Sequence, residues 1–85
     1  MVEKKLIGNI IHFYPKISVA VLELEGTLKV GDKISIERES GSFEQVVDSM
    51  QMEHENIQEA KAGDAIGMKV AESTSKGAKV FKVIE

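Results

Sequence analysis

One short turn recurs three times in this 85-residue chain and constrains what the chain can fold into. Glycine tolerates positive φ, and aspartate accepts hydrogen bonds from nearby backbone groups, so Gly-Asp before an alternating segment predicts a tight turn that starts a strand. In each copy an aliphatic residue stands three places after the glycine. The copies are Gly31-Asp32 before residues 33–36, Gly63-Asp64 before residues 65–70, and Gly77-Ala78 before residues 80–84.

Alternating apolar and polar residues predict strands on either side of these turns. We expect strands at residues 4–13, 17–25, 33–38, 43–52, 65–70 and 80–84, with Gly8 bending the first one. Segment 53–61 is too short for an independent helix, and we expect a loop anchored by Ile57. Short strands at regular spacing predict an all-β sandwich or barrel. We favour a small closed antiparallel β-barrel of about six strands, because closure removes exposed edges.

Length and composition restrict the class of protein. A chain of 85 residues is expected to form one domain, residues 1–85, with a mainly aliphatic core. The absence of cysteine excludes disulfides and fits a reducing compartment, so we expect a cytoplasmic protein. Residues 1–7 lack the apolar run of a signal peptide, and no segment is long and apolar enough to cross a membrane, so no membrane contact is expected.

The sequence carries no recognisable catalytic motif. There is no Gly-x-Ser-x-Gly elbow, phosphate-binding loop or Gly-x-Gly-x-x-Gly turn, so we expect no enzyme activity, no catalytic residue and no cofactor. The cluster Glu53-His54-Glu55 has metal-ligand residue types, but an extended backbone would turn His54 away from both glutamates. We therefore expect a solvated loop and no metal. His12 is expected to be a strand residue with an exposed or hydrogen-bonded ring.

Charge argues against a dedicated nucleic-acid binder, since eleven basic and fourteen acidic residues give a net charge of −3. An RNA contact would need a local patch, or a larger assembly in which this chain is one component. The best local candidate is Phe13-Tyr14-Pro15-Lys16, where aromatic rings stand beside a cation at a turn. Such rings can stack a base or grip a peptide. Alternatively, Phe13 belongs to the core and Tyr14 covers a barrel rim.

Residues 49–70, SMQMEHENIQEAKAGDAIGMKV, resemble the second, β-barrel domain of translational GTPases such as elongation factor Tu. Leu28–Asp32 resembles an earlier turn of that domain, and Lys76-Gly77 resembles the turn before its last strand. The resemblance covers about residues 6–84 and implies a translation-factor domain II barrel. The chain is also similar to short elongation factor-like proteins of archaea and bacteria, and to the small C-terminal barrel of collagenase-like peptidase family proteins. In both groups the resemblance implies a non-catalytic accessory.

The sequence departs from this family at the first hairpin. The family has a glycine-rich hairpin followed by a Gly-Arg-Val-like run, whereas this chain has Tyr14–Ile17 and then Leu22–Leu24. Family contacts made through that hairpin and arginine therefore do not transfer. No GTPase domain accompanies the barrel in this sequence, so we expect no GTP to be bound by this chain alone.

These observations predict a non-catalytic binding module that serves translation or RNA modification and contacts RNA, the ribosome or a partner enzyme. The candidate binding residues lie at the predicted rim: Tyr14, Lys16, Lys29, Lys33 and Arg38. Two alternatives remain open. The chain could be a protein–protein adaptor without a nucleic-acid role, if Phe43 or Val47 faces outward. It could instead be an enzyme or small-ligand barrel with converging polar groups in a pocket.

Overall fold

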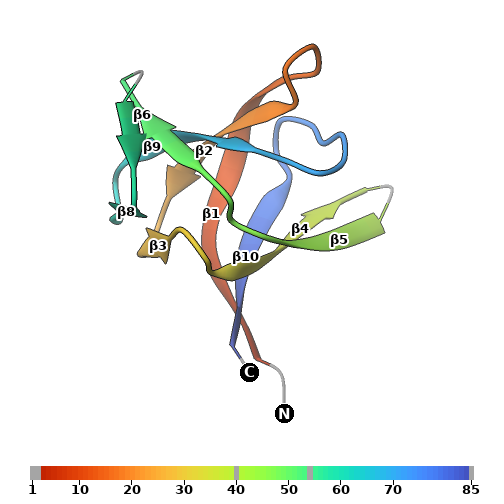
Figure 1. The fold of residues 1–85 in the computed structure, drawn as a ribbon. Coiled ribbons are helices and arrows are strands. Elements are labelled where there is room, and N and C mark those ends of the chain that lie inside the picture. Colours follow the sequence, from red (N-terminus) through yellow and green to blue (C-terminus); the bar gives the residue numbers. More distant parts are fainter. Residues whose placement is uncertain (1–2, 40, 54, 85) are drawn as a thin grey trace.

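A computed structural model describes residues 3–39, 41–53 and 55–84. This part of the chain contains strands and turns but no helix, which confirms the all-β prediction (Figure 1). It therefore also contains no helix long and apolar enough to span a membrane. The strands are β1 (Glu3–Tyr14), β2 (Val19–Leu24), β3 (Leu28–Lys29), β4 (Lys33–Arg38), β5 (Gly41–Val46), β6 (Met50–Met52), β7 (Glu55–Ile57), β8 (Glu59–Ala60), β9 (Ala65–Lys69) and β10 (Lys79–Ile84).

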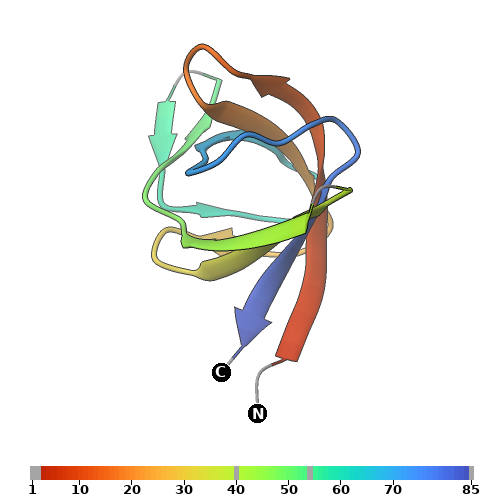
Figure 2. The same ribbon diagram turned by 90° about the vertical axis from the view of Figure 1, so that its right-hand side faces the viewer.

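The central strand β1 belongs to two ladders at once. It pairs with β10 from Glu3 to Asn9 and with β2 from Gly8 to Tyr14, both antiparallel. The full order in this sheet is β5-β4-β10-β1-β2-β9-β6-β7, and β3 and β8 form a separate two-stranded ladder. Figure 2 shows the strands wrapping around one axis, while the lower parts of β1 and β10 extend away together.

Gly8 marks the position where β1 is paired on both sides. The register with β10 shifts between Leu6 and Gly8, so the expected bend in the first strand is confirmed. A Cβ at Gly8 would lie only 2.6 Å from the carbonyl oxygen of Glu23 in β2. Only glycine allows β2 to approach this closely.

The predicted closed six-stranded barrel needs correction. The sheet order is open, with β5 and β7 at its two ends. The strand expected at 43–52 is interrupted at residues 47–49, and the loop expected at 53–61 contains β7 and β8. Val47 bonds the Gly31-Asp32 turn at the start of β4: its N–H donates to Asp32 O (2.8 Å), and its carbonyl accepts from Gly31 N (2.8 Å). Ile57 does pack against the core, as expected of an anchor.

A side chain bridges the gap where β5 approaches the end of β9. The Gln45 carboxamide donates from Nε2 to Lys69 O (3.0 Å) and accepts at Oε1 from Ala71 N (2.7 Å). An amide side chain thus provides the donor and acceptor that a neighbouring strand would provide. One side chain rather than a backbone ladder therefore joins β5 to the end of β9, and the sheet itself remains open.

The three predicted turns share one geometry. Gly31, Gly63 and Gly77 have φ of 98°, 92° and 94°, which glycine adopts at low cost. The residue after each glycine donates its N–H three residues back: Asp32 to Lys29 O (3.1 Å), Asp64 to Lys61 O (3.0 Å) and Ala78 to Ser75 O (3.2 Å). The carboxylates of Asp32 and Asp64 also accept from Lys29 N (2.9 Å) and Lys61 N (3.0 Å).

The core is aliphatic, as the composition predicts. Its fully buried large side chains come from both halves of the sheet and from the connections: Ile7, Ile10, Leu22, Leu24, Leu28, Ile34, Ile36, Val47, Met50, Ile66, Met68 and Val80. Most strands turn one face inward, so their alternate residues form the outer surface, where a partner could bind. In β4, however, Ile34, Ser35 and Ile36 are all buried.

We expect Gln45→Ala to lower the free energy of unfolding by about 2 kcal/mol, since two hydrogen bonds of about 1 kcal/mol each are lost between β5 and the end of β9. Urea denaturation measures this change. Gln51→Ala is the matched control, because the Gln51 amide bonds only the exposed side chain of Asn56 (3.1 Å). Equal losses for the two variants would contradict a bridging role for Gln45.

Gly8→Ala should cost about 2 kcal/mol or more, because the added methyl meets a backbone oxygen that cannot move freely. Gly67→Ala should leave stability unchanged or slightly higher, since its Cβ would lie 3.5 Å from Val19 Cγ1, an ordinary contact. Thermal unfolding of the two variants tests this contrast, and a Gly8→Ala protein as stable as the parent would contradict the close approach.

Candidate functional site

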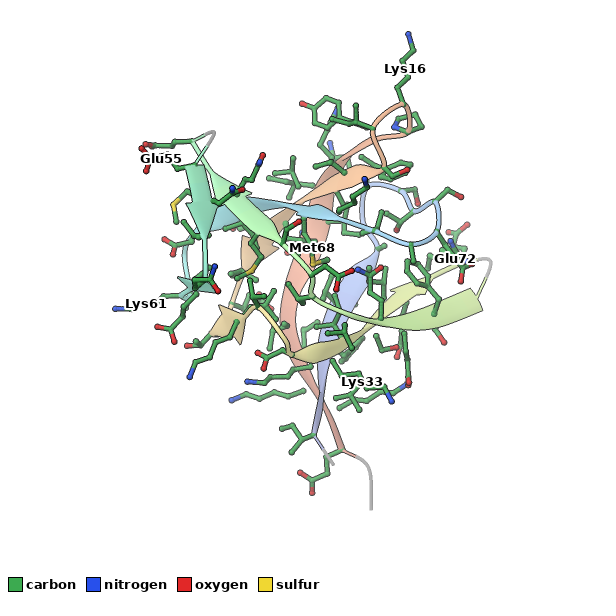
Figure 3. All side chains as sticks on the ribbon, viewed as in Figure 1. Lys16, Lys33, Glu55, Lys61, Met68 and Glu72 are labelled. Carbon is green, nitrogen blue, oxygen red and sulfur yellow. The ribbon has the colours of Figure 1, made fainter. Side chains whose placement is uncertain are left out.

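The five candidate residues do not form one rim. Lys16 lies at the tip of the hairpin between β1 and β2, and Lys33 lies near the opposite end of the molecule (Figure 3). Lys29 belongs to β3, and Arg38 ends β4. Only Tyr14 and Lys16 are neighbours in one surface element. The binding role predicted for the other three residues would therefore require separate contacts.

Lys29, Lys33 and Arg38 are each paired with a carboxylate inside the chain. The nitrogen–oxygen distances are 3.5 Å for Lys29–Glu59, 3.4 Å for Lys33–Glu44 and 3.1 Å for Arg38–Glu72. A phosphate would have to compete with these carboxylates, which lowers the attraction that each cation offers to RNA.

Arg38 also holds local structure together. Its guanidinium donates to the carbonyl oxygens of Gly41 (3.2 Å) and Ser73 and lies 4.7 Å above the ring of Phe43. Its side chain is only 17% exposed. These contacts clamp the β4–β5 hairpin onto the connection before β10, beside the Gln45 bridge.

The surface around Tyr14 is built by strand register. His12, Val21, Gly67 and Gln51 are successive partners across β1, β2, β9 and β6. Tyr14, Val19 and Lys69 form a second row across the first three of these strands. We call the outer surface formed by these two rows and by Ile17 the hairpin face.

The hairpin face presents two aromatic rings beside apolar surface. The centroids of His12 and Tyr14 are 4.3 Å apart, with an interplanar angle of 58°. Tyr14 is 47% exposed and Ile17 is 60% exposed, the largest exposure among the big apolar residues described. The turn that presents them is closed by Ile17 N donating to Tyr14 O (3.3 Å). His12 is exposed, as the sequence allowed.

A shallow hollow of about 170 Å³ lies within this face, lined by Ile17, Val19, Ser49, Gln51, Gly67, Met68 and Lys69. It exists because Gly67 places no side chain between Val21 and Gln51. Pockets for drug-sized ligands are about 300 Å³ or larger. This hollow therefore suits one flat ring or one side chain of a larger partner.

Two lysines border the hairpin face, Lys16 at the hairpin tip and Lys69 on β9. Among the described residues neither forms an ion pair, unlike Lys29, Lys33 and Arg38. Lys16 could be predicted from the sequence. Lys69 could not, because its position beside Tyr14 depends on the register of β2 with β9. The same holds for Val19, Gln51 and Gly67.

Two sequence alternatives depended on exposure or clustering. Phe43 is 8% exposed and Val47 is 1% exposed, so the expectation that they could form an outward adaptor surface is wrong. Phe13 is half-buried and packs against the core. Among the described residues no group of three or more His, Asp or Glu side chains could hold a metal, and His54 lies outside the described part.

A larger hollow, about 600 Å³, lies between the end of β4 and residues 75–79. Arg38, Lys76 and Lys79 line it together with Glu37 and Glu39. Mixed charges of this kind select neither an anion nor a cation.

The family model of elongation factor Tu domain 2 matches residues 21–80. The chain belongs to the elongation factor Tu domain 2 family. A Methanocaldococcus jannaschii protein named "Uncharacterized protease MJ0090" is 40% identical over 80 residues, which cover 93% of this chain and 20% of that protein. This chain thus spans about a fifth of the length of that relative.

Two crystal structures of the C-terminal domain of a Geobacillus thermoleovorans protein assigned to the U32 peptidases share the fold. One aligns with a TM-score of 0.86 and 16% identity over 92% of this chain and 91% of that chain. The selenomethionine variant gives 0.85 and 15% over 89% and 96%. The resemblance to translation-factor domain II and to the small peptidase-family barrel is therefore confirmed.

Arg38→Ala should lower the free energy of unfolding by about 2 kcal/mol, because carbonyl and carboxylate groups lose a partly buried donor. Lys16→Ala should change it by less than about 0.5 kcal/mol, as for exposed side chains without partners. Urea denaturation distinguishes the two. An Arg38→Ala variant with an unchanged free energy of unfolding would contradict the structural role of this arginine.

Proposed function

We propose that this chain is a non-catalytic binding module whose hairpin face contacts single-stranded RNA, as an accessory in translation or RNA modification. The observation that supports this proposal most is the exposed pair of His12 and Tyr14 rings beside a small hollow and two lysines that have no carboxylate partner among the described residues. Unpaired bases stack on aromatic rings, and each such contact contributes about 1–3 kcal/mol.

Each part of the hairpin face has a role in this proposal. Tyr14 and His12 offer π surfaces to a base. The hollow over Gly67 accepts a flat ring, and the amide of Gln51 at its border offers both a donor and an acceptor to a base edge. Lys16 and Lys69 contact phosphates on either side. Tyr14 and Lys16 thus keep their predicted role, whereas Lys29, Lys33 and Arg38 contribute at most a second contact.

The overall charge sets the strength of this contact. With a net charge of −3 and two lysines at the face that lack ion pairs with other described residues, binding to RNA alone should be weak and sensitive to salt. A module of this kind works inside a larger protein or assembly that supplies further contacts. The Methanocaldococcus relative fits this picture, because the matched segment is only 20% of its length.

A protein–protein adaptor is the second candidate, and the 60% exposure of Ile17 favours it. An apolar side chain at a hairpin tip can anchor a protein interface as well as border an RNA site. Under this alternative, Ile17 matters for binding and Tyr14 stacking does not.

We expect oligoadenylate at about 50 mM salt to shift the backbone amide signals of Tyr14, Ile17 and Gly67 in an NMR titration of the labelled chain. Tyr14→Ala should weaken this binding roughly tenfold, since a stacking surface is lost. Ile84→Ala is the matched control, because Ile84 is 42% exposed on β10 and pairs with Glu3, at the end of β1 opposite to Tyr14. No shift at these amides, or equal effects of the two variants, would reject the RNA contact and leave the adaptor function.

A further inference from the structure

The first four described residues of β1 form an open strand edge. From Glu3 to Leu6, β1 pairs with β10 alone, whereas from Gly8 onward it also pairs with β2. All four residues are exposed. Figure 1 shows this end of β1 running beside β10 away from the other strands. We call residues Glu3–Leu6 the β1 edge.

The backbone of the β1 edge can accept another strand. In an antiparallel ladder, alternate residues turn their N–H and C=O groups away from the partner, so part of this edge faces outward. The segment that follows β2 ends its contact with β1 at Ile7, one residue before the β1 edge: Ile7 O accepts from Glu25 N (2.6 Å) and Gly26 N (3.2 Å). From Leu6 back to Glu3, no described strand pairs with β1 on the side opposite to β10. Open edges of this kind are where extended peptides add.

The side chains of the edge specify the chemistry of that peptide. Lys5 stands directly opposite Lys82 of β10, and like charges in this arrangement repel. Lys82 reaches Asp32 at 3.3 Å, but Lys5 has no ion pair among the described residues. A carboxylate on an added strand would neutralise Lys5. Next to it, Leu6 is 39% exposed and opposite the half-buried Phe81, so an apolar residue fits beside Leu6.

A second copy of this chain does not fit the edge. Residues that stand opposite each other in an antiparallel ladder must face the same way, so symmetric pairing of two β1 edges would place Lys4 opposite Lys4 or Lys5 opposite Lys5. Lysines at an open edge are a common way to prevent such self-pairing. RNA cannot continue a backbone ladder at all.

We propose that the β1 edge binds an extended acidic segment of a protein partner, which adds a strand beside Glu3–Leu6. This interaction is separate from the RNA contact at the hairpin face and does not depend on it. Lys5 pairs with a glutamate or aspartate of the segment, and Leu6 packs against its neighbouring apolar residue. The backbone hydrogen bonds supply affinity, and these two side chains supply specificity.

The test uses the labelled full chain and the capped peptide Thr-Val-Glu-Glu-Lys-Thr in an NMR titration. We expect the amide signals of Glu3–Leu6 to shift while those of Tyr14 and Gly67 stay unchanged. Lys5→Glu should weaken binding at least roughly fivefold. That variant should remain folded, because it replaces a like-charge pair by an opposite-charge pair. Lys61→Glu is the matched control and should bind as the parent does, because Lys61 is exposed and lies outside both the β1 edge and the hairpin face.

Two further peptides isolate the cause of binding. A version with methylated backbone nitrogens keeps every charge but cannot form a ladder, so it should not bind. A version with lysines in place of the glutamates should also fail. Absent shifts at Glu3–Leu6, undiminished binding of either altered peptide, or displacement of the acidic peptide by oligoadenylate at these residues would overturn the proposal. None of these outcomes affects the hairpin face.

Discussion

The structure depends on β1 pairing with β10 on one side and with β2 on the other. This arrangement requires β2 to approach β1 closely at Gly8. Above Gly8 the strand joins β2 and carries His12 and Tyr14 into the hairpin face. Below Gly8 it joins β10 and leaves one side open at Glu3–Leu6. One glycine thus divides a single long strand into an end that builds an outer surface and an end that exposes its backbone. The two proposed binding surfaces lie at opposite ends of the same strand for this reason.

Much of the fold could be predicted, because alternation and turn chemistry are local. Segment 33–38 coincides with β4, and the three glycine turns have the expected positive φ. The break after β5 could not be predicted, since it depends on Val47 bonding a turn that is distant in sequence. That break also resets the alternation, so that Val47 and Met50 are both buried although their spacing would place them on opposite faces. The bridge that the Gln45 side chain forms between β5 and the end of β9 cannot be predicted from a pattern of apolar residues either.

The candidate site was predictable only where it is contiguous in sequence. Tyr14 and Lys16 stand together in the chain, so residue types alone identified them. Gly67 and Lys69 join them only through the registers of β1, β2 and β9. Conversely, Lys29, Lys33 and Arg38 looked like free cations because their partners Glu59, Glu44 and Glu72 come from other strands or connections. Strand register thus adds residues to the candidate face and gives carboxylate partners to cations that the sequence alone leaves unpaired.

The pairing of cations explains how an acidic chain can still carry the surface that we propose for RNA. Net charge governs long-range attraction, but contact affinity depends on which charges remain unpaired at the surface that binds. Here the carboxylates of β5, β8 and the β9–β10 connection are occupied by cations far from the hairpin face. That face is left with aromatic rings, aliphatic side chains, an amide and two lysines. Weak attraction at a distance combined with stacking on contact would suit the module that we propose, one that a larger protein brings to RNA, and the open strand edge would offer a means to hold that protein.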